Sequence, residues 1–224
     1  MTASSTAELS RSGRSHAVAD QVRAGILDGT YPLGARLPEP ELCAAFDVSR
    51  NTLRESFRVL GEERLVVHEL NRGVFVRVPT EQDVRELYDA RRLVECAAVR
   101  DHGRRTQGLA AVAETLERAG RLAATGDWVG VGTADIDFHR ALTALGSVRV
   151  EALMQSIWNE MRLAFHVVGR PDEFHGTYLA RNHVVLDTLV QRGGVAAAKE
   201  LRTYLDEAEQ RVLRAYRTRA AGRA

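Results

Sequence analysis

The sequence has little of what marks a secreted or membrane-embedded protein. Only two of its 224 residues are cysteines. Cys43 and Cys96 lie far apart, each within an apolar helical pattern, so we expect two buried, reduced thiols and no disulfide framework. No apolar run approaches the ~20 residues that a membrane span requires, and no basic-then-apolar leader precedes the first domain. We therefore expect a soluble, cytoplasmic protein.

The sequence also lacks an excess of charge of either sign. Its 31 Lys and Arg residues are balanced by 30 Asp and Glu residues, which gives a net charge of +1. The pI of about 7.9 is below the value above ~9 that is typical of a nucleic-acid coat protein. Any binding to nucleic acid must therefore come from a local patch. The 45% of hydrophobic residues suffices for a real core in one large or two small domains.

The first third of the chain has the pattern of three helices followed by a hairpin. Apolar residues recur at helical spacing over 15–28 and 50–62, and a short helix is expected over 39–46. Two β-rich runs follow within 64–78, joined at 69–73 by turn residues. This order of elements predicts a winged helix-turn-helix domain. Residues 1–14, which are small and polar without a period, are expected to form a flexible arm.

The pattern changes between residues 77 and 81. Glycine and proline become rarer, and helical periodicity continues almost to the end of the chain. About six helices are expected, over 81–103, 107–124, 127–145, 149–168, 175–192 and 194–217. The sequence therefore predicts a mainly α protein, with a winged helix-turn-helix domain at 15–78 and an all-helical bundle at 79–218. Residues 219–224 are expected to form a flexible tail.

The third helix of the first domain carries the features of a DNA-reading element. Ser49 is a credible N-cap, because its hydroxyl can accept a hydrogen bond from a first-turn N–H group. Arg50, Arg54 and Arg58 follow one line opposite the apolar face, where guanidinium groups can reach phosphates or guanine edges. Asn51 and Thr52 are short polar neighbours of Arg50. Three arginines alone could equally form a solvated helix face, but the preceding helix, the turn and the hairpin favour DNA binding.

The tip of the predicted hairpin is a second candidate for DNA contact. Asn71 and Arg72 could reach a phosphate or the minor groove, and Gly73 permits a tight turn.

These residues resemble the DNA-binding domain of the GntR family of bacterial transcription regulators. The matching pieces are G-x-R-L at 34–37, E-L at 41–42, V-S-R at 48–50, L-R-E at 53–55 and R-G-V-F-V at 72–76. The resemblance implies DNA contacts from Arg50, Arg54, Arg72 and Gly73, with Arg36 at the DNA backbone. Pro40 stands where the family usually has a basic residue, which implies that one phosphate contact is missing.

A single winged domain reads too few base pairs for selectivity in a genome, so we expect a homodimer on a palindromic operator. The family resemblance implies a dimer as well.

The helical half resembles the C-terminal ligand-binding (FCD-type) domain of the FadR subfamily. The similar segments are 87–100, 135–145 and 181–193. The resemblance implies a sensor of small carboxylates, in which several members hold a metal ion with one Asp and three His residues. The long-chain acyl-CoA sensor of the same subfamily has no metal.

Two polar residues interrupt the apolar stripe of the helix predicted at 127–145. Asp135 and His139 are one turn apart in line with Leu142, whereas Asp137 points towards solvent. A buried carboxylate costs several kcal/mol unless it is paired. His183 falls in line with Leu179, Leu186 and Val190 on another helix, and could be a third ligand.

The remaining position of the family's metal site differs in this chain. Tyr204 stands where the pattern places the third histidine, and a neutral phenol is a poor ligand. Three interpretations stay open: Asp135, His139 and His183 hold a Zn, Ni or Mn ion with open positions, the polar cluster binds the effector without a metal, or the pair is structural. His166 is a conceivable substitute ligand on an ambiguous helix face.

Arg91 has two interpretations as well. By resemblance it turns inward and pairs with an effector carboxylate. Alternatively it forms an ordinary surface pair with Glu95 at i, i+4.

Three classes of function compete. The first is a ligand-responsive regulator, expected to be a repressor, in which a small carboxylate bound in the bundle near Arg91 and Tyr204 changes operator affinity. The alternative is a metal-dependent enzyme that uses the Asp/His cluster. No second acid–base pair or nucleophile is visible, and a winged helix has no use in such an enzyme. The near-neutral charge argues against the third class, a structural DNA-bending protein.

Overall fold

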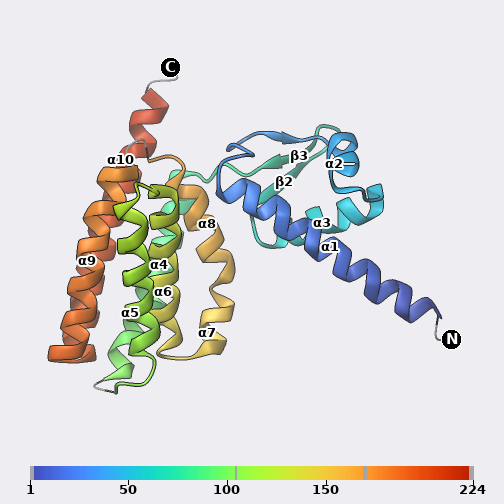
Figure 1. Ribbon diagram of the computed structural model, residues 1–224. Coiled ribbons are helices and arrows are strands. Elements are labelled where there is room, and N and C mark those ends of the chain that lie inside the picture. Colours follow the sequence, from blue (N-terminus) through green and yellow to red (C-terminus); the bar gives the residue numbers. More distant parts are fainter. Residues whose placement is uncertain (1–2, 104, 169–170, 222–224) are drawn as a thin grey trace. The chain divides into compact units, whose positions relative to one another are not determined.

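The computed structural model describes residues 3–103, 105–168 and 171–221, with side chains over 13–103, 105–168 and 172–218. The chain divides between Val78 and Pro79 into two compact units, unit 1 (1–78) and unit 2 (79–224), which are described separately (Figure 1). The predicted fold class is confirmed: unit 1 is a winged helix-turn-helix, and unit 2 is helical.

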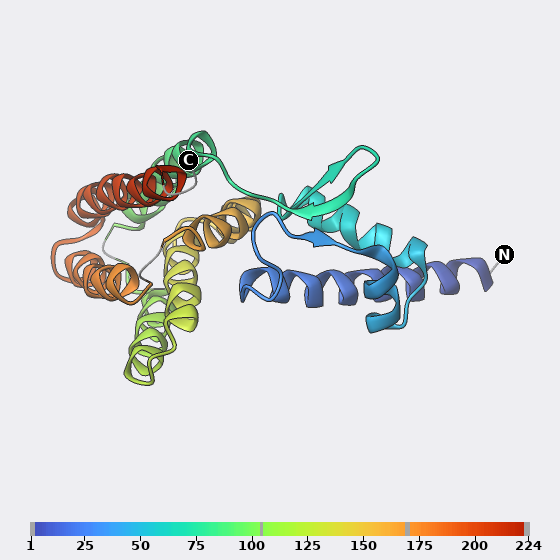
Figure 2. The same ribbon diagram turned by 90° about the horizontal axis from the view of Figure 1, so that it is seen from above.

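Within the described residues, unit 1 contains three helices and a three-stranded antiparallel sheet. In chain order its elements are α1 (Ala3–Leu27), β1 (Arg36–Leu37), α2 (Glu39–Phe46), α3 (Arg50–Glu62), β2 (Val66–Glu69) and β3 (Gly73–Val76). The strand order is β1-β3-β2. The predicted hairpin is β2–β3, which extends beside α3 in Figure 2. The two-residue strand β1, which the sequence pattern does not predict, pairs with the edge of β3 that faces away from β2.

The core of unit 1 lies between α1 and α3. Val18, Val22 and Ile26 are at most 4% exposed, and the apolar face of α3 is fully buried. The Ser56 hydroxyl also donates to the Ser15 carbonyl (2.8 Å). The backbone is helical from Ala3 onwards. Residues 3–14, which the sequence predicts as part of a flexible arm, are therefore helical in the structure. Residues 3–14 contain no proline, and a helix nucleated by packed turns extends at little cost.

Unit 2 has seven helices within its described residues, one more than the pattern predicts. They are α4 (Glu81–His102), α5 (Leu109–Ala124), α6 (Trp128–Ala144), α7 (Val148–Leu153), α8 (Gln155–Phe165), α9 (Pro171–Arg192) and α10 (Gly194–Ala221). The helix predicted at 149–168 is divided at Met154, which ends α7 and caps α8 with ψ near zero. The helical backbone includes 219–221, and the tail residues 222–224 lie outside the described part of the chain.

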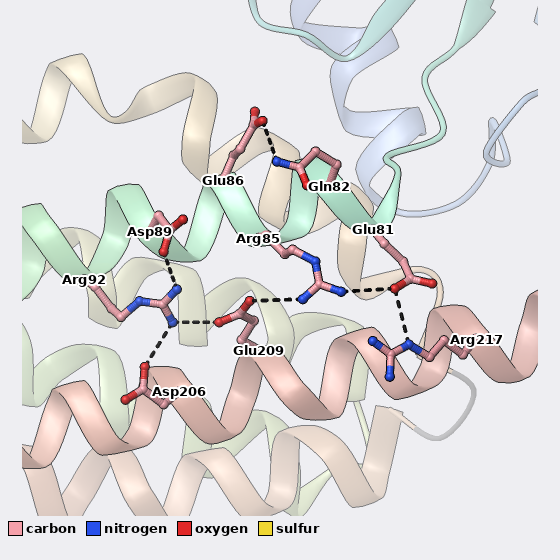
Figure 3. A network of polar contacts seen from close by, with 9 residues as sticks. All are labelled: Glu81, Gln82, Arg85, Glu86, Asp89, Arg92, Asp206, Glu209 and Arg217. Atoms are coloured by element: carbon pink, nitrogen blue, oxygen red, sulfur yellow. Dashed lines mark hydrogen bonds and ion pairs between the residues drawn. The ribbon is translucent and has the colours of Figure 1, made fainter.

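Helix α4 lies along α10 and is joined to it by a network of ionic groups (Figure 3). Arg92 donates to Asp206 (3.1 Å) and Glu209 (2.8 Å) across the helix pair. Arg217, near the end of α10, donates to Glu81 in the first turn of α4 (3.3 Å). A capping box at Thr80 fixes the start of α4. The first turn of α4 thus lies beside the end of α10.

The other end of α10 is held by a close approach of two backbones. The Gly194 N–H group donates to the Gly103 carbonyl (2.7 Å). A Cβ at Gly194 would lie 2.4 Å from the Val99 carbonyl oxygen and 2.6 Å from that of Arg100. Only glycine therefore allows the turn between α9 and α10 to meet the last turn of α4.

None of the described helices is long and apolar enough to cross a lipid bilayer. Cys43 and Cys96 are both free, and both are half-buried where full burial is expected.

Candidate nucleic-acid interface and effector site

Helix α3 presents its predicted DNA-reading residues on the exposed side. The N-cap predicted at Ser49 is confirmed, since its hydroxyl accepts from the Thr52 N–H group (3.2 Å). Arg50, Asn51 and Arg54 are exposed. The left-handed backbone of Asp47 (φ 49°) ends α2 and turns the chain towards α3. The amphipathic face of the helix therefore fixes which side chains point outward.

Two arginines of unit 1 have no ionic or hydrogen-bonding partner for their guanidinium groups within the described residues, namely Arg36 on β1 and Arg50 at the start of α3. Arg54, by contrast, bonds Glu39 (3.2 Å), and Arg58 bonds Glu55 and Glu62. A guanidinium without an internal partner can bind phosphate or a base edge without first breaking an ion pair.

Thr52, predicted to contact DNA, is buried. Its side chain is 7% exposed, and its hydroxyl lies 2.9 Å from that of Ser49. The first turn of α3 places Thr52 on the inner side of the helix, so it shapes the cap and does not face a groove. Pro40 lies exposed in the first turn of α2, where it offers no side-chain donor.

The wing brings the second group of predicted residues together. Asn71, Arg72 and Gly73 are exposed at its tip, and the positive φ of Asn71 (61°) and Gly73 (106°) forms the turn. Arg72 pairs with Glu69 and lies over the Phe75 ring. The Arg36 side chain passes close to Gly73, since a Cβ there would be 3.5 Å from its Nε. Arg36 thus lies against the base of the wing.

In unit 2, the buried polar groups form one continuous hydrogen-bonded chain, called the polar chain below. It runs across four helices: Arg91 and Glu95 of α4, His139 and Asp135 of α6, Tyr204 of α10 and Asn182 of α9. The distances are 2.7 Å for Arg91 to Glu95, 2.6 Å for Glu95 to His139 Nδ1, 3.1 Å for His139 Nε2 to Tyr204, 3.3 Å for Tyr204 to Asp135 and 2.7 Å for Asn182 to Asp135.

All six members of the polar chain are at most 6% exposed. Burial alone would raise the pKa of Glu95, but Arg91 and His139 outweigh it and hold the pKa below its ordinary value. Burial and the nearby Asp135 carboxylate raise the pKa of Tyr204 well above its ordinary value. Glu95 is therefore ionised at neutral pH, and Tyr204 is a neutral phenol.

Arg91 has one feature of each of its two interpretations, and its pairing with an effector carboxylate stays a prediction. Arg91 turns inward and is 1% exposed, yet it pairs with Glu95. The pair is buried and not on the surface. Burial opposes the charge on Arg91, but Glu95 outweighs it, so the pKa of the guanidinium is raised.

Three buried hydrogen-bond donors close to one another lack a partner within the described residues. They are Arg91 Nη2, the Tyr88 hydroxyl and Trp158 Nε1. The Arg91 guanidinium lies over both rings, at 5.1 Å from the Tyr88 centroid and 5.8 Å from that of Trp158. An unpaired buried donor is costly. Three unsatisfied donors are thus carried by side chains that pack against one another.

His183 is not part of the polar chain, and the helix face predicted for it is wrong. Its side chain is exposed, as is Val190 (61%). The neighbouring stripe of Tyr178, Asn182, Val185 and Leu189 is the buried one, so Asn182 takes the place expected of His183. His166 is exposed as well. Asp137, expected in solvent, is half-exposed and pairs with Arg118.

His175 is a buried residue that the sequence analysis does not single out. It is 5% exposed, and Nδ1 has no partner within the described residues. Gly132 makes room for its ring, since a Cβ there would lie 2.8 Å from Nε2. Burial lowers the pKa of His175, against the opposite effect of Asp135. The pairing of a glycine on α6 with a histidine on α9 is visible only in three dimensions.

Beside His175 the packing leaves only a narrow gap without room for a water molecule, lined by Ala119, Val131, Asp135, His175, Leu179 and Asn182. The carbonyl oxygen of the Asn182 side chain is buried there without a partner within the described residues. The unpaired atoms of Asn182 and His175 therefore lie beside a closed gap between α6 and α9.

The donors present do not fit the metal site that the family resemblance implies. Of the three predicted ligands, Asp135 and His139 lie together and His183 does not. Among the described residues, no group of three or more His, Cys, Asp or Glu side chains is arranged to hold a metal ion.

Two family models match the chain. Residues 14–76 match the model of the bacterial regulatory proteins of the gntR family, and residues 86–207 match the FCD domain. The galactonate operon transcriptional repressor of Escherichia coli is 30% identical over 214 residues, which cover 84% of this chain and 91% of that protein. The gluconate operon transcriptional repressor of Bacillus licheniformis is 34% identical, but the match spans only 35% of that protein and 39% of this chain.

Solved structures are similar over most of the chain. A crystal structure from Rhodococcus sp. RHA1, described as a transcriptional regulator GntR, is 54% identical with a TM-score of 0.88, and the match covers 91% of this chain and 99% of that one. The Escherichia coli protein McbR/YncC, 18% identical over 91% of this chain and 98% of its own, has a TM-score of 0.74 and supports the fold alone.

Proposed function

Because the chain belongs to the GntR family of bacterial transcriptional regulators and carries an FCD domain, we propose that it represses transcription as a homodimer on a palindromic operator. The observation that carries the DNA-binding part is Arg50, exposed at the N-terminal end of α3 without a partner among the residues that the structure describes. A two-fold dimer doubles the sequence that one winged domain reads. The relatives described above are regulators and not enzymes.

The DNA-binding proposal is tested by Arg50→Ala in a gel-shift assay with the operator. We expect operator binding to be lost, because a bidentate arginine contact contributes about 1–3 kcal/mol in each half-site. The matched control is Arg100→Ala, which makes the same change of charge on the exposed surface of α4. Operator affinity that is equal in both variants would refute the assignment of α3.

For unit 2 we propose that the effector is a small hydroxylated carboxylate. The donor atoms without a partner among the described residues, on Tyr88, Trp158 and the Nη2 of Arg91, suit its carboxylate, and the unpaired Asn182 side-chain carbonyl suits a hydroxyl group. The operon names of two relatives, gluconate and galactonate, are those of such acids, which supports the class without identifying the compound. Binding between the helices would shift the population of dimer geometries and release the operator.

The effector class is tested by thermal shift and operator release with matched acids. Gluconate and galactonate are compared with hexanoate, which has the same carbon number without hydroxyl groups. We expect a response to hydroxy acids, weakened about tenfold or more by Tyr88→Phe and by Trp158→Phe, since each removes a hydrogen bond to a charged group. Tyr31→Phe in unit 1 is the control. A response to hexanoate alone, or one unchanged in both variants, would contradict the proposal.

A further inference from the structure

The position between Asp135 and His139 is closed by hydrogen bonds from the chain itself, and we infer from this geometry that the bundle is a metal-independent sensor. Tyr204 and Asn182 donate to the carboxylate that a cation would otherwise bind, and the Tyr204 hydroxyl lies within hydrogen-bonding distance of the imidazole. The sensing role rests on the proposed function. The absence of a metal does not, since metal binding can be measured without DNA or effector.

His139 is oriented as a metal ligand would be, but the space in front of it is taken. Its Nδ1 bonds Glu95 at 2.6 Å, the arrangement that in metal sites directs Nε2 towards the ion. Here Nε2 faces the Tyr204 hydroxyl at 3.1 Å, and the same hydroxyl lies 3.3 Å from Asp135 Oδ1. A Zn²⁺ ion bound to both groups needs contacts of about 2.0–2.2 Å. It would overlap the phenol oxygen.

Tyr204 is held firmly in this position. The side chain is 2% exposed, and its ring contacts those of His139 and Tyr178 at centroid distances of 5.2 and 5.0 Å. The Arg181 guanidinium lies over the same ring at 5.4 Å. The buried hydroxyl keeps its proton, so it acts as a hydrogen-bond donor and not as an anionic ligand. A cation could enter only by moving a packed aromatic residue.

Asn182 closes the carboxylate from the other side. Its Nδ2 donates to Asp135 Oδ1 at 2.7 Å, so the amide presents a donor where a ligand atom would be needed. Turning the amide over would place its carbonyl oxygen against the carboxylate and lose that hydrogen bond. Asp135 Oδ1 thus accepts two hydrogen bonds, which meet part of the cost of burying its charge.

The geometry makes a gain-of-function experiment decisive. Asn182→His and Tyr204→His together would replace both closing groups with imidazoles next to Asp135 and His139. Tag-free protein is treated with EDTA, dialysed, incubated with a small excess of ZnCl₂ or NiCl₂, desalted and analysed for metal. We expect wild type to retain much less than one ion per chain, and the double variant to retain about one, with a raised melting temperature in the presence of the metal.

Two matched variants separate this site from adventitious binding. His183→Ala, at the exposed neighbour of Asn182, is expected to change nothing in either background. Asp135→Ala in the double variant is expected to abolish the gained metal. If the double variant does not fold, as judged by circular dichroism, the wild-type measurement decides by itself. Retention of about one ion by wild type, lost in wild type with Asp135→Ala, would overturn the inference, as would a folded double variant that binds none.

Discussion

At the scale of single residues, the interior of unit 2 is organised by opposing demands on buried polar groups. Glu95 and Arg91 neutralise each other in the polar chain, whereas His175 has no charged partner that would favour its protonated form enough to offset burial. A buried imidazole in this situation stays neutral. Near pH 6, above the range in which the Glu95 carboxylate is protonated, the acid response of unit 2 should therefore be concentrated in His175.

We expect unit 2 to lose stability as the pH falls below about 6.5, the ordinary pKa of histidine. The folded-state pKa of His175 is lowered, so between that value and 6.5 the unfolded chain binds more protons than the folded one, and unfolding is favoured. Both tryptophans, Trp128 and Trp158, lie in unit 2, so urea unfolding followed by tryptophan fluorescence reports on this unit. In His175→Asn the loss between pH 7.5 and 5.5 should be smaller. The same slope in both proteins would mean that another group titrates.

At the scale of elements, α4 and α10 pack along each other and are joined by ion pairs. Arg92 is 12% exposed and Glu209 10% exposed in their side chains, so their ion pair is screened far less than one on the surface. Glu81 and Arg217 extend the same network to the start of α4 and the end of α10 (Figure 3).

Arg92→Met should destabilise unit 2 by about 1–3 kcal/mol. Methionine keeps most of the apolar stem. It leaves the buried Glu209 with Arg85, at 4.0 Å, as its one remaining cationic partner among the described residues, and breaking a buried pair leaves the remaining charge uncompensated. The control is Glu86→Gln, an exposed position where a change within ~0.5 kcal/mol is expected. Urea unfolding monitored by tryptophan fluorescence compares the two. Equal stability of both variants would show that the network contributes nothing.

The sequence predicts the buried face of a helix well where the helix has a single apolar stripe, and less well where it has two. Val18, Val22 and Ile26 form a single apolar stripe, and all are buried. On α9, the stripe through Leu179 and Leu186 competes with the one through Tyr178 and Val185. The partners that choose between them, α6 and α10, are distant in sequence. This is why Asn182 is a member of the polar chain and His183 is not.

The remaining differences have local causes. The break at Met154 carries no glycine or proline, so nothing in the residue types indicates it. The two residues of β1 are too few to show an alternation. At the candidate sites, two of the three predicted metal ligands, Asp135 and His139, and both predicted effector contacts, Arg91 and Tyr204, lie in the polar chain. The third predicted ligand, His183, does not. The contribution of His175 could not be predicted, because it depends on the space left by Gly132 on another helix.

At the scale of the whole molecule, a net charge of +1 means that attraction to DNA must come from a few arginines. Arg36 is exposed on β1 without an internal partner within the described residues, a position suited to the DNA backbone. Arg50 on α3 is suited to bases. The two residues should therefore differ in how their loss affects binding.

Arg36→Ala should weaken operator binding at low salt and reduce its salt dependence. Each phosphate contact contributes ~0.9 to the slope of log K against log salt, so a dimer that loses one contact per chain should lose about two units. Discrimination between the operator and unrelated DNA should change little. Fluorescence anisotropy at several salt concentrations measures both quantities. An unchanged slope with lost discrimination would instead place Arg36 at a base edge.

The glycine turn between α9 and α10 anchors the first residue of α10 against α4. Gly194 donates its N–H group to the Gly103 carbonyl and packs against the last turn of α4, so this end of the helix is anchored there. Its 28 residues extend about 40 Å, with Tyr204 nearer the turn and Arg217 towards the other end. If the proposed effector moves Tyr204 and α10 turns about Gly194, Arg217 would be displaced more than Tyr204, because it lies farther from the turn. The change would then be largest at the ion pair of Arg217 with Glu81, in the first turn of α4.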